Sequence, residues 1–162
     1  MESGPRRRAG LSAAAVIVVL VGAYAALPFR GDRWWIGAVV GVALLVAIGP
    51  LTVRRVRAVL VSERPAVEAA EALAVLFTML VVGFAALYYA MDREAGHFSG
   101  IGTRLDAIYF TVTTLATVGY GDIAPASQGA RAAVTVQMVF DLLFIGVAAR
   151  VLVTAARGRI NR

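Results

Sequence analysis

The chain has 162 residues, 60% of them hydrophobic, and a formal net charge of +6. Soluble domains are nearer half apolar, and the excess here lies in long apolar blocks, which indicates a membrane protein. There is no cysteine, so disulfides, thiol catalysis and thiolate metal sites are excluded. All 16 basic residues are arginines, and most of them flank the apolar blocks. This placement is typical of membrane topology and does not indicate nucleic-acid binding.

Four segments approach the roughly 20 apolar residues that a membrane-spanning helix needs. They are residues 11–28, 34–51, 66–90 and 130–156. The first follows a run of arginines, as a signal peptide would, but it is too long for a typical signal core and has no convincing cleavage site after it. We therefore expect a retained helix.

A shorter segment, residues 104–116, lies between the third and fourth blocks and leads into a glycine-rich turn. Irregular backbone at membrane depth is tolerated only where protein or a water-filled cavity covers it. The pattern predicts an all-α membrane protein with four transmembrane helices plus a re-entrant pore helix and loop. We expect a two-helix module at residues 1–65 and a pore module at residues 66–162.

The arginines predict the topology. Clusters precede the first block, lie between the second and third, and follow the fourth, so all of them fall on one side of a four-span chain. Positive loops are cytoplasmic, which predicts a multi-pass cell-membrane protein with both termini in the cytoplasm. Trp34, Trp35, Tyr88 and Tyr89 lie at the opposite ends of their helices, as interfacial anchors do.

The glycine-rich turn reads Thr117, Val118, Gly119, Tyr120, Gly121. Its two glycines can take backbone conformations that are barred to residues with a Cβ, so successive carbonyls can face one axis. One such strand supplies only part of the oxygen shell that a dehydrated K⁺ ion needs. Four strands around an axis supply stacked rings of carbonyls. One loop per chain therefore predicts a homotetramer in a lipid bilayer.

The longer stretch from Thr113 to Asp122, TTLATVGYGD, resembles the signature of tetrameric potassium channels. The resemblance covers roughly residues 66–157. It implies a K⁺-selective subunit that conducts passively, with permeant K⁺ bound at Thr117, Val118, Gly119 and Tyr120. No nucleophile–base pair, metal-ligand cluster or phosphate loop indicates an enzyme or an organic cofactor. A cation channel of low selectivity and a non-channel membrane subunit remain as alternatives.

Four residues are expected to support this filter: Tyr109, Phe110, Thr113 and Asp122. The first two stand where the family often carries an aromatic pair that braces the filter, and we expect the Tyr109 hydroxyl to bond Asp122. Ordinary apolar packing is the alternative for both rings. Thr113 stands where some relatives carry a glutamate. Asp122 either concentrates cations at the pore mouth or caps a turn.

Two residues of the last apolar block, Asp141 and Gly146, are candidate functional residues. Asp141 is an ionisable residue in an apolar span, which is costly and usually faces a cavity or a partner. The acid and the Phe-Ile-Gly-Val sequence that follows it, residues 144–147, resemble the inner helix of inward rectifiers. This resemblance implies that four such carboxylates line the cavity and bind Mg²⁺ or polyamines. Protonation, or pairing between helices, is the alternative. Gly146 is a candidate hinge, with close helix packing as its alternative.

Overall fold

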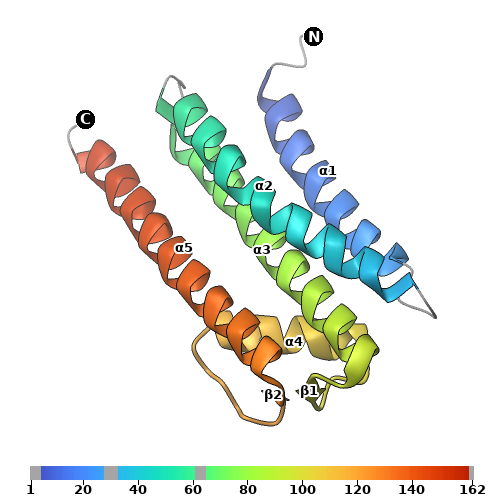
Figure 1. Ribbon diagram of the computed structural model, residues 1–162. Helices are drawn as coiled ribbons and strands as arrows, with labels where there is room; N and C mark the ends of the chain where they lie inside the picture. The colour runs from blue at the N-terminus through green and yellow to red at the C-terminus, as the bar shows by residue number, and fades with distance from the viewer. Residues whose placement is uncertain (1–4, 28–32, 61–64, 161–162) are drawn as a thin grey trace.

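The computed structural model describes residues 5–27, 33–60 and 65–160. Within these residues the chain forms five helices and two short strands (Figure 1). In chain order they are α1 (Pro5–Ala26), α2 (Trp34–Leu60), α3 (Pro65–Ala95), β1 (Phe98–Ser99), α4 (Arg104–Leu115), β2 (Ala124–Pro125) and α5 (Gln128–Ile160). All five predicted helical segments are therefore helices.

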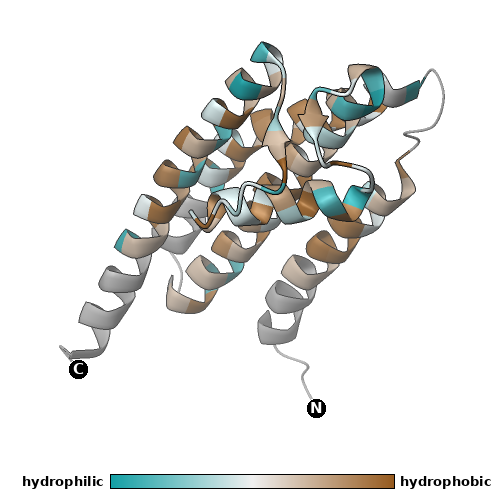
Figure 2. Cartoon of the chain, turned by 90° about the horizontal axis from the view of Figure 1, so that it is seen from below, coloured by the Kyte–Doolittle hydropathy of each residue, from teal (hydrophilic) through white to brown (hydrophobic). Residues whose placement is uncertain are grey.

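The four long helices run alongside one another, with both chain ends at one end of the bundle (Figure 1). The short helix α4 and the strand pair lie at the opposite end (Figure 1). Figure 2 shows hydrophobic residues along most of the helix lengths and hydrophilic residues mainly at helix ends and loops.

Three helices are long and apolar enough to cross a membrane, namely Trp35–Arg54, Ala66–Ala95 and Gln128–Arg150. Within the described residues, α1 adds the shorter apolar stretch Ala13–Ala26. A mostly helical membrane protein is thus confirmed, whereas the expected count of four spans is not.

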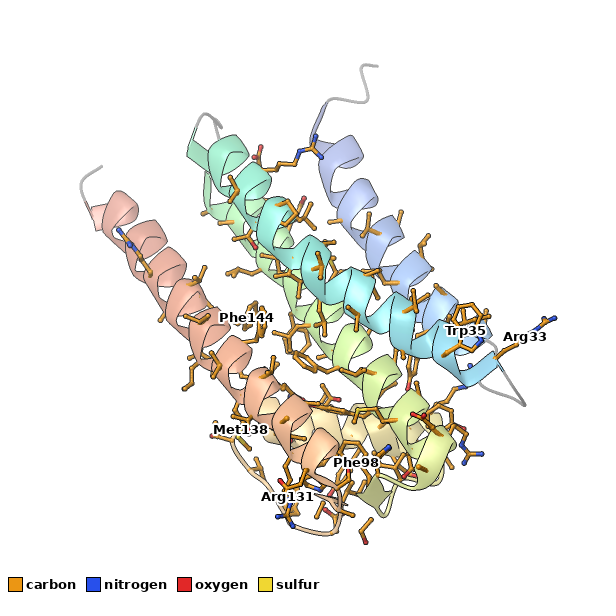
Figure 3. The ribbon with its side chains drawn as sticks, in the orientation of Figure 1. Arg33, Trp35, Phe98, Arg131, Met138 and Phe144 are labelled. Atoms are coloured by element: carbon orange, nitrogen blue, oxygen red, sulfur yellow. The ribbon has the colours of Figure 1, made fainter. Side chains whose placement is uncertain are left out.

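Helix α3 is the centre of the fold. It contacts α1, α2, α4 and α5, and Leu80, Phe84 and Tyr88 on it are almost completely buried. Helix α5 instead packs mainly on α3 and leaves much of its apolar surface uncovered: Leu142 is 67% exposed and Leu143 63% exposed. Figure 3 shows Phe144 pointing from α5 toward α3, where its ring centroid lies 6.1 Å from that of Phe77.

Two glycines allow α2 and α3 to approach closely. A Cβ added at Gly41 would lie 2.7 Å from the carbonyl oxygen of Gly83 and 3.1 Å from the backbone nitrogen of Leu87. Both of those neighbours are backbone atoms, which cannot move aside without shifting α3. Small residues at a helix crossing favour close packing of this kind in membranes.

We expect Gly41→Ala to destabilise the folded protein by about 1–3 kcal/mol, the usual cost of overpacking. Gly49→Ala is the matched control, because it lies on the same helix and its added Cβ would meet no atom within 4 Å. Thermal unfolding of both variants in detergent measures the difference. Equal melting temperatures would show that the crossing tolerates a methyl group.

Candidate functional site

The pore helix α4 begins at a capping box. The backbone nitrogen of Asp106 donates to Thr103 Oγ1 over 3.2 Å, and the backbone nitrogen of Thr103 donates to Asp106 Oδ2 over 2.7 Å. Hydrogen bonds from Thr103 hold the pKa of the Asp106 carboxyl below its ordinary value. A reciprocal cap satisfies donors that a helix start leaves unpaired, so the first turn of α4 is firmly defined.

The other end of α4 holds the filter segment by its amide groups. The carbonyl of Thr113 accepts from the backbone nitrogens of Val118 at 2.9 Å and Gly119 at 3.3 Å. The carbonyl of Thr114 accepts from the nitrogen of Thr117 at 2.9 Å. In a planar trans peptide the carbonyl points opposite to the N–H that follows it. The carbonyls of residues 116, 117 and 118 therefore point away from the pore helix.

Backbone φ angles alternate in sign along the same segment. They are +58° at Thr117, +54° at Gly119 and +81° at Gly121, whereas Val118 and Tyr120 are not in the positive region. Alternation between left- and right-handed residues gathers N–H groups on one side of the chain, which leaves the carbonyls on the other. This is the geometry that the sequence predicts for the two glycines.

Thr117 shares this positive-φ conformation although it is not a glycine. A β-branched residue at positive φ is a real outlier, and such a left-handed position costs on the order of 1–2 kcal/mol. The hydrogen bond from its backbone nitrogen to Thr114 holds it there. Strain of this kind gathers at functional segments, where the surroundings enforce it.

Beside the filter, the Tyr109 hydroxyl donates to Asp122 Oδ2 over 2.9 Å, so the expected bond is present. The Tyr109 ring stacks on that of Tyr120, with centroids 6.3 Å apart and an interplanar angle of 4°. The hydrogen bond to Asp122 raises the pKa of the Tyr109 phenol. Both ends of the segment are thus fixed to α4, one by backbone and one by a side chain.

Phe110 and Thr113 act differently from the expected brace. Phe110 is buried, with its ring 5.5 Å from that of Tyr88 and 5.6 Å from that of Phe98, so it packs on α3 and β1. Thr113 contacts the filter through its carbonyl, while its hydroxyl donates to the carbonyl of Phe110 over 3.1 Å. Within one protomer, the Phe110 ring therefore takes part in ordinary apolar packing, which was the alternative to bracing the filter.

Strands β1 and β2 close the pore loop by pairing antiparallel, with Phe98 opposite Pro125 and Ser99 opposite Ala124. The segment before the pore helix is thereby joined to the segment after the filter. Residues 75–157, just over half of the chain, match the family described as ion channel. The chain belongs to this ion channel family.

Similar curated proteins are potassium channels. The chain is 50% identical over 58 residues to Two pore potassium channel b of Oryza sativa subsp. japonica, which is 35% of this chain and 16% of that protein. It is 36% identical over 79 residues to Two-pore potassium channel 5 of Arabidopsis thaliana, covering 48% and 18%. Voltage-gated potassium channel Kch of Escherichia coli (strain K12) is 42% identical over 55 residues, covering 34% and 13%.

The chain therefore spans less than a fifth of each of these three relatives. No solved structure matches it significantly. The family match shows an ion channel family, and the relatives named here are potassium channels.

Sequence reasoning missed a buried polar network in this channel. The Tyr88 hydroxyl of α3 donates to Gln137 Oε1 of α5 over 2.6 Å. Gln137 Nε2 donates to the carbonyl of Thr111 on α4 over 3.0 Å and to Asp141 Oδ2 over 3.1 Å. Tyr88, Thr111 and Gln137 are 0% exposed. One amide thus joins the outer, pore and inner helices.

The orientation of the Gln137 amide follows from its partners. A backbone carbonyl can only accept, so the amide nitrogen must face Thr111, and the amide oxygen then faces Tyr88. The Tyr88 hydroxyl donates to this amide, and the amide donates in turn to the carbonyl of Thr111 and to Asp141 Oδ2. The Oδ1 atom of Asp141 is buried and has no hydrogen-bond partner among the described residues.

Asp141 is 3% exposed and faces the interior of its own protomer. This placement disagrees with the expectation that its carboxylate lines the cavity and binds Mg²⁺ or polyamines. The physical reason is that Gln137, four residues earlier, lies on the same helix face and supplies a donor. The pairing alternative describes the residue better, although its partner is on α5 itself, and no blocker site is proposed.

We expect Gln137→Leu to lower the free energy of unfolding by about 1–3 kcal/mol for each buried group left without a partner. Adding Asp141→Leu should recover part of that loss, because the two side chains share one network. Thr135→Val is the control on α5, since this exposed hydroxyl bonds only the carbonyl of Arg131. Additive effects of the two substitutions would contradict the coupling.

Tyr109 should ionise at a higher pH than an ordinary tyrosine, because its pKa is raised. Its bond to Asp122 is then complete below the usual tyrosine pKa of about 10 and is lost as pH rises through the higher folded value. Ultraviolet titration of the wild type minus Tyr109→Phe isolates this phenol. Asp122→Asn should lower the pH at which the Tyr109 phenol ionises. An unchanged titration midpoint would show that the bond does not persist in solution.

Proposed function

We propose that four copies of this chain surround one axis and form a K⁺-selective pore that conducts passively. Each copy contributes the segment from Thr117 to Gly121. Its carbonyls replace the hydration shell of the permeant ion. K⁺ would bind at Thr117, Val118, Gly119 and Tyr120, with the Thr117 end toward the cytoplasmic side. No organic cofactor is part of the proposal.

The direction of the filter carbonyls carries this proposal. Three consecutive carbonyls point away from the pore helix because the N–H groups that follow them bond to α4. The same segment alternates in φ from Thr117 to Gly121. A row of parallel carbonyl dipoles attracts cations, and it forms a complete shell only when several rows meet.

Exposure within the single chain supports a homotetramer. Val118 is 51% exposed and Tyr120 is 70% exposed, and both lie in irregular backbone. Such backbone cannot face lipid at membrane depth, so protein must cover it. Neighbouring copies supply that cover, and the apolar face of α5 supplies further contact area.

The fold supports a multi-pass topology in the cell membrane with both termini in the cytoplasm. The start of α1, the end of α2, the start of α3 and the end of α5 lie at one end of the bundle, and α4 lies at the other (Figure 1). Counting α1 as a fourth span places the arginine-rich segments on one side. Gly146 stays a proposed hinge of α5. A Cβ there would meet no atom within 4 Å, so close packing within the described protomer does not account for this glycine.

Purified protein in liposomes tests the proposal. We expect K⁺ flux that Ba²⁺ blocks and that exceeds Na⁺ flux, from a particle four times the 17.0 kDa chain mass. Equal K⁺ and Na⁺ flux would favour a channel of low selectivity. A particle of the right mass without flux under any K⁺ gradient would favour a non-channel subunit.

Gly119→Ala should reduce K⁺ flux at least about tenfold. Alanine at φ +54° costs on the order of 1–2 kcal/mol in each of four copies, although the added Cβ has space. Gly129→Ala is the matched control, since it lies near the pore loop with its nearest side-chain atoms at 3.8 Å or beyond and no positive φ. Wild-type flux in Gly119→Ala would mean that this backbone conformation is dispensable.

A further inference from the structure

The end of α1 is bound directly to the start of the pore helix. Arg104, the first residue of α4, donates through Nη1 to the carbonyl of Tyr24 over 3.0 Å and to that of Ala25. Its Nη2 donates to the carbonyl of Leu27 over 2.7 Å. The Tyr24 hydroxyl donates back to the carbonyl of Arg104 over 2.9 Å.

This contact satisfies groups that the helix itself leaves unpaired. The last four carbonyls of a helix lack intrahelical partners, and α1 ends at Ala26. A cation also interacts favourably with the negative end of the helix dipole. The planar guanidinium presents several donors in a fixed fork, which a lysine cannot reproduce.

Tyr24 anchors the same contact in the core. It is 4% exposed and belongs to the cluster of buried residues that includes Phe84 and Ala107. Phe84 lies on α3 and Ala107 on α4, so Tyr24 belongs to the same buried core as two of the three helices of the pore module. The link between α1 and α4 is therefore a buried side chain plus a ring of hydrogen bonds.

The pore helix carries this contact to the filter. Arg104 and Thr113 are nine residues apart in one helix of 12 residues, which is about 14 Å along its axis. One end of α4 is held by α1, and the carbonyls at the other end hold the amides of Thr117, Val118 and Gly119. A short, capped helix moves as a unit, so displacement of its first turn displaces its last.

We propose that Arg104 is a positioning residue through which the N-terminal helix α1 sets the stability of the conducting filter. The inference rests on the proposed K⁺ conduction. It assigns α1 a specific role: the helix lies outside the pore module and holds the pore helix in position through Arg104.

The test measures how much K⁺ the filter needs to stay conducting. Ion binding stabilises the state that binds it, so a less stable filter needs a higher K⁺ concentration to sustain a steady current. Full-length wild type, Arg104→Lys, Arg104→Gln and Tyr24→Phe are reconstituted in planar bilayers. The half-maximal K⁺ concentration for steady current is measured, and thermal stability is measured separately.

We expect the half-maximal K⁺ concentration to rise at least about threefold in Arg104→Gln, with smaller rises in Arg104→Lys and Tyr24→Phe. Lysine keeps the charge without the fork, and Tyr24→Phe removes one hydrogen bond. Arg33→Gln is the control, because this arginine is exposed and points away from the helices at the start of α2 (Figure 3). It should leave the K⁺ dependence unchanged.

The outcomes separate the two proposals. If wild-type protein carries no K⁺ current, the proposed function fails and this inference falls with it. If the wild type conducts and the variants lose thermal stability without a shift in K⁺ dependence, Arg104 is only structural and the inference alone is overturned. If Arg104→Gln does not fold, the half-maximal K⁺ concentrations of Arg104→Lys and Tyr24→Phe test the inference. Wild-type values in both would overturn it.

Discussion

The carbonyl of Thr113 is the constraint on which the pore loop depends. It accepts from two successive filter amides, and this forces the carbonyls before those amides to face the other way. A regular strand would alternate its carbonyls between two sides, as strand pairing requires. The filter segment instead bonds the N–H groups of Thr117, Val118 and Gly119 to the pore helix, so the carbonyls that precede them face away from it. A cation is the natural partner for such a row.

The loop can hold this unusual backbone because both of its ends are closed. Besides the β1–β2 pair, the carbonyl of His97 accepts from the backbone nitrogens of Ala126 at 2.9 Å and Ser127 at 3.3 Å. The His97 ring contacts Ser127 Oγ at 2.6 Å, and that oxygen accepts from the nitrogen of Ala130 in the first turn of α5. One histidine thus connects the outer loop to the start of the inner helix.

Much of this architecture follows from local patterns. Apolar length predicts the long helices, and the pore helix is predicted at residues 104–116 and observed at Arg104–Leu115. The sequence does not reveal which residues of different helices form hydrogen bonds with each other. Gln137 bonds residues 49 and 26 positions away, and Arg104 reaches residues about 80 positions away. Such pairs depend on helix rotation and register, which apolar length does not set.

The sequence nevertheless contains a spacing pattern that predicts which way the Asp141 side chain faces. Ala130, Val134, Gln137 and Asp141 are all buried, and their spacing of four, three and four residues places them on one helix face. The polar pair on α5 therefore shares a face with residues that pack on α3 and α4. Polar residues in membrane helices usually face the bundle interior, and here that interior lies within one protomer.

This rotation of α5 has a consequence for the proposed pore. The opposite face, between residues 135 and 147, is exposed in the single chain, and its only side-chain hydrogen-bonding group is that of Thr135. In a tetramer this face is shared among neighbouring subunits, lipid and the cavity below the filter. Wherever it lines the cavity, the wall is apolar, and apolar constrictions control ion passage by excluding water. In the proposed pore, the filter carbonyls and the pore-helix dipole are the groups that attract the ion, whereas Asp141 is buried within the protomer beside Gln137.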